Sequence, residues 1–96
     1  MPQYMIIARD GTDAKASERR LNMRPAHFET AKQLKADDNF IIGGAILDDN
    51  GQMIGSMMVV QFETEDDLVR WMRNEPYING EVWQSIEVKT FRVAEV

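Results

Sequence analysis

The sequence predicts an α+β fold with the element order βαββαβ, in which the strands form one antiparallel sheet. Two observations support this prediction. Short apolar runs of β-favouring residues recur along the chain and end at clusters of turn formers. Between them lie two stretches of good helix formers with an apolar stripe. The chain has 96 residues, which leaves no material for a second hydrophobic core, so we predict one domain over residues 1–96.

A polar stretch separates the first strand from the first helix. Residues 3–9 favour a strand, which ends at the turn formers of residues 10–13. Residues 14–23 have no sustained hydrophobic period and could form a loop or a short helix. Pro25 suits the first turn of a helix, so we predict a helix that begins there and continues to Asp38.

The next two strands are predicted as a hairpin. Residues 40–47 and 53–62 are apolar runs, and the chain between them contains Asn50-Gly51, which is a strong hairpin signal. Thr64 is a typical N-cap residue and acidic residues follow it, so a second helix is predicted to begin there.

The C-terminal part of the chain is predicted to contain one more strand. The second helix must end before Pro76, because the residue that precedes a proline is pushed out of the helical conformation. Residues 78–80 look like a turn. Residues 85–93 alternate in polarity, as a half-buried strand does.

This order of elements is that of the ferredoxin-like arrangement, in which both helices cover the same face of the sheet. The predicted strands nevertheless carry apolar residues on both faces, as where Met57 and Val59 alternate with Met58 and Val60. A large uncovered apolar face is rare on a soluble monomer. We therefore expect a homodimer in which two sheets pack face to face, with Met57 and Val59 or their alternates at the interface.

Composition excludes several classes of function. The net charge is −5, which repels phosphate backbones, so we expect no nucleic-acid partner. No apolar run approaches the roughly 20 residues that span a bilayer, and residues 1–4 do not resemble a signal peptide, so we expect a cytoplasmic protein with no membrane partner. One histidine and no cysteine make a metal or haem site the least favoured option, and we predict neither metal nor cofactor.

His27 is the residue most suited to chemistry. A helix that begins at Pro25 places His27 in its first turn, where the helix dipole disfavours a charged imidazole and keeps the ring neutral. A neutral imidazole can act as a general base. The alternative, which is the more frequent one for an isolated histidine, is a partly buried ring with a structural hydrogen-bond partner.

Three charged residues could assist His27. Arg20 and Arg24 could bind a substrate carboxylate, although each could instead be solvated or paired with surface acids. Glu75 could orient the imidazole, although a surface position in a turn is more frequent for such a residue. We predict that Glu75 comes within hydrogen-bond reach of His27 if the turn-rich chain from Glu75 to Gln84 runs back along the sheet.

The sequence resembles the YCII-related (YciI-like) family over essentially its whole length. The resemblance rests on the arginine-rich run from Glu18 to His27, on Gly43-Gly44, on Gly55-Ser56, on Glu75-Pro76-Tyr77 and on the closing residues 88–91. It implies a dimeric α+β barrel and a pocket with a His and Asp pair suspected of acid–base work. One member type is similar to a dehydrochlorinase of chlorinated hydroxyquinols.

The resemblance also implies roles for individual residues. His27 matches the family histidine, and Glu75 replaces the aspartate of the family's Asp-Pro-Tyr, so the acid is longer by one methylene. His27 and Glu75 are therefore the expected catalytic residues. The expected substrate-binding residues are Arg20, Arg24, Ser56 and Tyr77.

Two functions remain open from the sequence. The first is a cofactor-independent enzyme that uses His27 and Glu75 for proton abstraction, isomerisation or HX elimination on a small anionic or phenolic compound. The second is a non-catalytic dimeric module that binds a small ligand or assists another protein. A ligand-sized cavity on which His27 and Glu75 converge would favour the enzyme, because fold analogy alone does not decide function.

Overall fold

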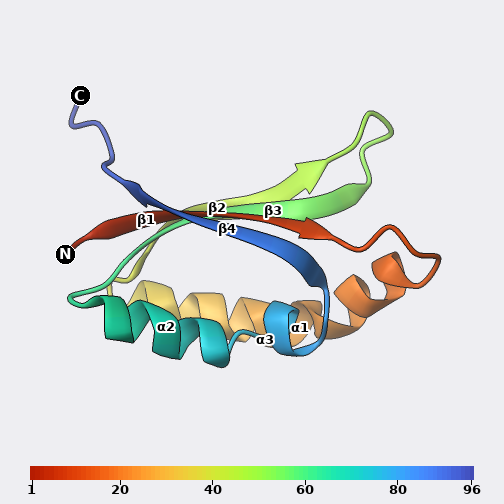
Figure 1. The fold of residues 1–96 in the computed structure, drawn as a ribbon, viewed down its shortest axis with the longest axis horizontal. Helices are drawn as coiled ribbons and strands as arrows, with labels where there is room; N and C mark the ends of the chain where they lie inside the picture. The colour runs from red at the N-terminus through yellow and green to blue at the C-terminus, as the bar shows by residue number, and fades with distance from the viewer.

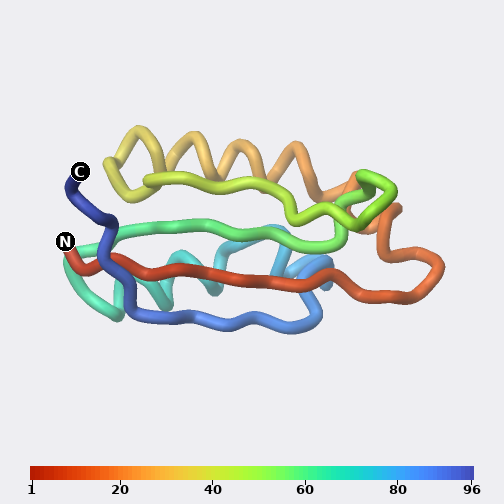
Figure 2. The backbone as a smooth tube through the Cα atoms, turned by 90° about the horizontal axis from the view of Figure 1, so that it is seen from above, coloured from red at the N-terminus to blue at the C-terminus, as the bar shows by residue number.

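The computed structural model describes residues 1–96 as a four-stranded antiparallel sheet with its helices on one face (Figure 1). The strand order across the sheet is β2-β3-β1-β4. Figure 2 shows the strands in this order, with α1 running along the β2 side. The α+β, ferredoxin-like fold predicted from the sequence is confirmed. The elements are β1 (Gln3–Asp10), α1 (Ala16–Ala36), β2 (Phe40–Leu47), β3 (Met53–Gln61), α2 (Glu65–Arg73), α3 (Pro76–Asn79) and β4 (Trp83–Phe91).

The hydrophobic core lies between the sheet and the helices. Tyr4, Ile6 and Ala8 of β1 point into it and are at most 9% exposed. Their neighbours Met5 and Ile7 lie on the other face of the sheet and are only partly buried. This alternation follows from the two-residue period of a strand. It is the pattern expected from the sequence.

The β2–β3 hairpin has the predicted position. β2 spans Phe40–Leu47, as expected, and the turn contains Gly51 with a φ of 80°, a conformation that glycine adopts without steric cost. The Asp48 carboxylate accepts hydrogen bonds of 2.9 Å from the backbone N–H groups of Asn50 and Gln52. These bonds close the turn and set the register of the two strands.

Helix α1 begins nine residues earlier than the sequence predicted. It starts at Ala16, so Pro25 lies inside the helix and the predicted start at Pro25 is wrong. An internal proline removes one backbone donor, the one that would bond the carbonyl of Leu21. Leu21 is 59% exposed, on a side of the helix where water is available. The first half of α1 buries Ala16 and Arg20 instead of large apolar side chains, which hides its helical period.

Helix α2 begins as predicted, and a short helix α3 follows it. The Thr64 hydroxyl accepts a 3.2 Å hydrogen bond from the backbone N–H of Asp67 and so caps α2. The prediction of a turn at residues 78–80 missed α3, which spans Pro76–Asn79. Glu75 is its N-cap residue and has the extended backbone expected before a proline. Strand β4 then begins at Trp83, two residues before its predicted start.

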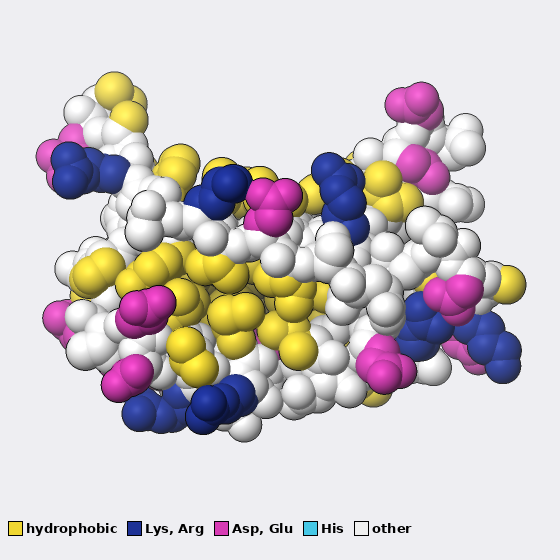
Figure 3. Space-filling view, viewed as in Figure 1, with side chains coloured by type: hydrophobic (Ala, Val, Ile, Leu, Met, Phe, Trp, Pro, Cys, Tyr) yellow, Lys and Arg dark blue, Asp and Glu magenta, His cyan; other side chains and the backbone are white.

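The face of the sheet opposite the helices is uncovered. Figure 1 shows no element above it, and Figure 3 shows apolar side chains along this side, between the raised C-terminal segment and the β2–β3 turn. In register, Met57 of β3 lies between Ile7 of β1 and Gly44 of β2. Ile42, also on this face, is 56% exposed.

The helices contain no segment with the length and hydropathy of a membrane span.

Candidate active site

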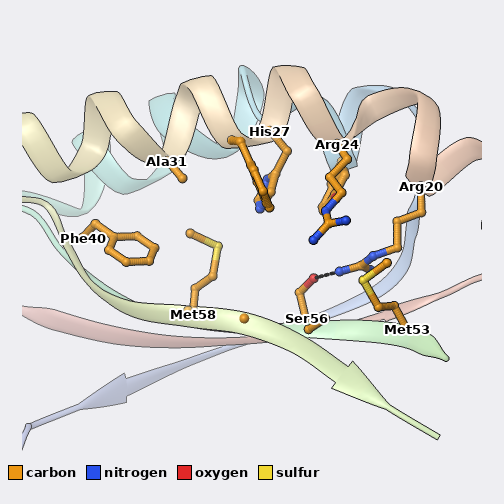
Figure 4. Close-up of a pocket in the computed structure, with 13 residues that line it drawn as sticks. Arg20, Arg24, His27, Ala31, Phe40, Met53, Ser56 and Met58 are labelled. Carbon is orange, nitrogen blue, oxygen red and sulfur yellow. Dashed lines mark hydrogen bonds between the residues drawn. The ribbon is translucent and has the colours of Figure 1, made fainter. Parts of the chain in front are cut away.

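A cavity of about 190 Å³ lies between α1 and the strands β2 and β3. Figure 4 shows side chains from the helix above and from the strands below pointing toward one another across it. The wall combines apolar side chains with a few polar ones. Its apolar part includes Phe28, Ala31, Phe40, Met53 and Met58, and its polar part includes Arg20, Arg24, His27, Ser56 and Tyr77. All the sequence-predicted site residues except Glu75 therefore line one cavity.

Glu75 lies behind His27 and is hydrogen-bonded to it through Oε1 and the ring Nδ1. The carboxylate is completely buried, and its Oε1 also accepts a 3.1 Å hydrogen bond from the backbone N–H of Tyr77. The predicted contact between His27 and Glu75 is thus present. The expectation of a surface position for Glu75 is wrong. Glu75 is the N-cap residue of α3, and its side chain is buried against His27 of α1.

The His27 ring is held on two sides. The Tyr77 ring stacks on it, with the centroids 3.9 Å apart and the planes 8° from parallel. An ionised carboxylate can only accept a hydrogen bond, so an ionised Glu75 requires the ring proton on Nδ1 and leaves Nε2 as the acceptor. A neutral histidine in this tautomer can take a proton from a ligand.

The predicted position of His27 in the first turn of a helix is wrong, and with it the argument that a helix dipole keeps the ring neutral. His27 lies near the middle of α1, not in its first turn, because the helix begins at Ala16. The effect of a helix dipole falls off within the first turn and so does not reach this ring.

Arg20 forms a buried ion pair that the sequence did not reveal. Its Nη1 lies 2.9 Å from both carboxylate oxygens of Asp10, and the two side chains are only 5% and 4% exposed. Its Nη2 donates a 2.9 Å hydrogen bond to Ser56 Oγ, and its guanidinium carbon lies 4.9 Å from the centroid of the Tyr77 ring. Arg20 therefore lines the cavity with its charge already compensated, and it is neither solvated nor paired at the surface.

Arg24 differs from Arg20 in having no acidic partner. No carboxylate lies within ion-pair distance of it. Its guanidinium carbon lies 4.9 Å from the centroid of the Phe28 ring, and the side chain is partly exposed. Among the cations of the cavity wall, Arg24 is the one whose charge is available to a ligand.

Asp10 is the site residue that the sequence analysis missed. It ends β1, and its place in a cluster of turn formers suggested only a turn. The sequence offered one signal: Asp10 is an acid at the end of a predicted strand, and an arginine-rich segment follows it before His27. That signal gave no spacing that would pair Asp10 with Arg20, because the long helix α1 was not predicted in this region.

Two further residues complete the cavity wall. Burial raises the pKa of the Tyr77 phenol, while the nearby Arg20 and Arg24 act against this shift, so Tyr77 is protonated at neutral pH. Ser56 lies beside Gly55, where a Cβ atom would come 2.4 Å from the backbone oxygen of Ala8. Only glycine permits this approach of β3 to β1, as predicted for the glycines within the strands. No group of three or more His, Asp or Glu residues is placed to hold a metal ion.

The family model of the YCII-related domain matches residues 2–92 of the chain. The chain belongs to the YCII-related family. Its relatives include Protein YciI of Escherichia coli, which is 28% identical over 95 residues that cover 93% of this chain and 95% of that protein. The family membership inferred from the sequence is confirmed.

Two further comparisons concern proteins with named chemistry. The derivative of benzaldehyde biosynthesis cluster protein C of Emericella nidulans is 31% identical over 94 residues, which cover 90% of this YCII-related chain and 96% of the fungal protein. The structure of a 5-chloro-2-hydroxyhydroquinone dehydrochlorinase from Burkholderia phenoliruptrix, in complex with 2,5-dihydroxybenzoquinone, matches with a TM-score of 0.81. That match covers 96% of this chain and 95% of the other at 21% identity, and it establishes similarity of fold.

Proposed function

We propose that this YCII-related protein is a cofactor-independent enzyme that performs acid–base chemistry on a small anionic or phenolic ring compound. The observation that carries the proposal is His27 in the wall of a cavity that also contains the unpaired cation of Arg24, with the fully buried Glu75 hydrogen-bonded behind His27. Perturbed or buried ionisable groups that converge on a cavity are typical of catalytic sites.

The size of the cavity supports a single-ring substrate. An apolar cavity of about 150 Å³ accommodates benzene, and this one has a volume of about 190 Å³ with a largely apolar wall. The relatives point the same way: one is a dehydrochlorinase with a bound dihydroxybenzoquinone, and another is named for a benzaldehyde biosynthesis cluster. Arg24 at the rim suits a phenolate or carboxylate.

The proposed chemistry starts with proton abstraction by Nε2 of His27. Glu75 keeps the opposite ring nitrogen protonated and stabilises the imidazolium that forms. The electron pair of the broken bond then either moves to a neighbouring carbon, which His27 reprotonates in an isomerisation, or expels a halide as HX is eliminated. Isomerisation moves one proton, and elimination releases H⁺ to His27 and halide to solvent; neither is a net oxidation or reduction, so no redox partner is needed.

We further propose that the protein works as a homodimer in which the uncovered sheet faces meet. The support is the row of apolar side chains around Met57, Ile7 and Ile42 on a face that no element of the chain covers. A second copy offers a matching apolar surface, as expected for an isologous twofold interface. Removal of this apolar area from water would stabilise a small domain.

The acid–base proposal is tested with a panel of chlorinated and unchlorinated hydroxyquinols. Halide release and hydrogen–deuterium exchange at ring carbons are measured for the wild-type protein and for His27→Gln. The variant should lose about 10²- to 10⁴-fold in rate, the usual contribution of a general base. Lys32→Gln, on the solvent side of α1, is the matched control and should keep full activity.

Two results would count against the enzyme. An active His27→Gln variant would show that the chemistry does not use this base. Binding of the same compounds by the wild-type protein, with neither halide release nor exchange, would instead identify a small-ligand-binding module.

Two variants of Glu75 test the role of its charge. Glu75→Asp keeps the carboxylate and should retain a higher rate than Glu75→Gln, which cannot stabilise an imidazolium by its charge.

A further inference from the structure

Ser56 lies in the cavity wall with both acceptor positions of its hydroxyl oxygen occupied. Arg20 Nη2 donates to Ser56 Oγ over 2.9 Å, and the indole Nε1 of Trp83 donates to it over 3.2 Å. Guanidinium and indole groups can only donate, whereas a serine hydroxyl has two lone pairs and one proton. These two neighbours therefore fix the Ser56 oxygen as an acceptor, and its proton must be donated to a third group.

No group of the protein accepts that proton. The only hydrogen bonds of the Ser56 hydroxyl are the two that it accepts. The residue is 3% exposed, and it contributes to the wall of the cavity together with Arg24 and His27. Figure 4 shows the side chain rising from β3 toward the arginines. Buried donors are nearly always satisfied, so an unused donor at a cavity wall marks the position of a ligand acceptor.

We infer that Ser56 donates its hydroxyl proton to an acceptor oxygen of the ligand, and that the best acceptors are oxygens that carry no hydrogen, such as those of a phenolate, a quinone carbonyl or a carboxylate. This inference rests on the proposed function and narrows its substrate class. Arg24, which lines the same cavity from α1 and has no acidic partner, adds a second donor for such an oxygen. His27 supplies the acceptor, Nε2, from the helix side.

The substrate must match this polarity at two points. It presents an acceptor oxygen to Ser56, and elsewhere on the same ring it carries the acidic proton that His27 removes. A ligand group that can only donate a hydrogen bond would meet a second donor at Ser56 and would be disfavoured. Ser56 is thus a specificity-determining residue, while Arg20 and Trp83 are positioning residues that act through it.

The test uses two probes that fit a single-ring cavity and undergo no reaction there. Benzoate carries oxygens without hydrogen, and toluene has the same ring without any acceptor. Both are titrated by NMR into the wild-type protein and into Ser56→Ala. Loss of a hydrogen bond to a charged group should weaken benzoate binding about 10- to 100-fold. Toluene binding should change by less than about twofold, because the removed group makes only a polar contact.

Two more variants guard against a fold defect. Ser56→Ala leaves two buried donors without an acceptor, so Ser56→Cys, whose thiol is a weak donor and a weak acceptor, serves as the second variant. It should also lose benzoate affinity and keep toluene affinity. Trp83→Phe removes one of the two donors that fix the Ser56 oxygen but leaves its proton, so benzoate binding should weaken less than in Ser56→Ala, with toluene binding unchanged.

Unchanged benzoate affinity in Ser56→Ala or Ser56→Cys would overturn the inference, as would a wild-type protein that binds toluene but not benzoate. These outcomes are independent of catalysis, because benzoate is not turned over. A protein that binds benzoate through Ser56 but shows neither halide release nor exchange would keep this inference and lose the acid–base proposal.

Discussion

The two faces of the sheet are both apolar, but only the helix side buries charged groups. On the uncovered face, Glu87 and Lys89 of β4 lie beside Ile7 and Met5 and stay largely exposed. On the helix side, α1 and α3 bring Arg20, His27 and Glu75 into contact with the core and enclose a cavity. On the other side the strands present a row of apolar side chains with nothing above them. Buried charges cost free energy unless they are paired and hydrogen-bonded. Charged groups are therefore buried only on the face where we propose the chemistry. The uncovered face is the one on which we propose that a second copy packs.

The largest expected effect comes from breaking the charge compensation on the helix side. Asp10→Asn leaves the guanidinium of Arg20, which is 5% exposed, without its counter-charge. Removal of one partner of a buried ion pair costs about 3 to 5 kcal/mol. Urea unfolding at a fixed protomer concentration measures the loss. Asp13→Asn, which breaks the exposed pair with Arg19 at the same end of α1, is the control and should change stability far less.

Equal losses in Asp10→Asn and Asp13→Asn would contradict this part of the comparison. They would mean that the pair between Arg20 and Asp10 is solvated in solution, so that its burial contributes nothing particular to the site.

On the uncovered face of the sheet, we expect a substitution to change the stability of the protomer less but to weaken association strongly. Met57→Lys places a charge in the middle of the proposed interface, opposite Ile7 and Gly44. Dimerisation should weaken about thirtyfold or more, as for loss of an interface hot spot. Sedimentation at micromolar concentration should show a dimer for the wild type and monomer for the variant. Leu21→Lys, the same kind of change on the exposed side of α1, should remain dimeric.

A wild-type protein that sediments as a monomer would remove the proposed role of this face. A dimer that tolerates Met57→Lys would place the interface elsewhere on the molecule, such as along the free edge of β4.

The smallest effect concerns Tyr77, which stacks on His27 at the cavity wall. Burial raises its pKa in the folded protein above the ordinary value of 10.0. A group whose pKa is raised by folding contributes stability that is present below the unfolded pKa and is lost as the pH rises through the folded pKa. The free energy of unfolding should therefore fall as the pH rises above about 10. Tyr77→Phe should make this fall less steep, and urea unfolding at a series of pH values measures the difference.

Local sequence signals predicted those parts of the fold whose stabilising contacts are local. The hairpin around Gly51, the cap at Thr64 and the alternation in β1 depend on residues a few positions apart. The first half of α1 could not be predicted in this way. Its buried positions are occupied by a small residue and by Arg20, whose place is fixed by Asp10 on a different element. Pro25, which indicated a helix start, instead lies within the helix.

The contact between His27 and Glu75 was predicted only on the condition that the chain after helix α2 turns back along the sheet. The chain does so through α3, and Glu75 reaches His27. The complete burial of Glu75 and the partner of Arg20 were not predictable, because both depend on the position of a helix that the sequence pattern did not reveal. The donor that Ser56 presents to the cavity likewise becomes visible only once both of its donating neighbours are known.

The central claim is that Glu75 holds His27 with its proton on Nδ1, so that Nε2 is free to act as a base on the cavity side. The chain has a single histidine, so its two ring nitrogens give unambiguous ¹⁵N signals. At pH values where the ring is neutral, the account predicts a protonated Nδ1 and an unprotonated Nε2 in the wild-type protein. A proton on Nε2, with Nδ1 accepting from a protonated Glu75, would contradict the account, because the base would then face away from the cavity.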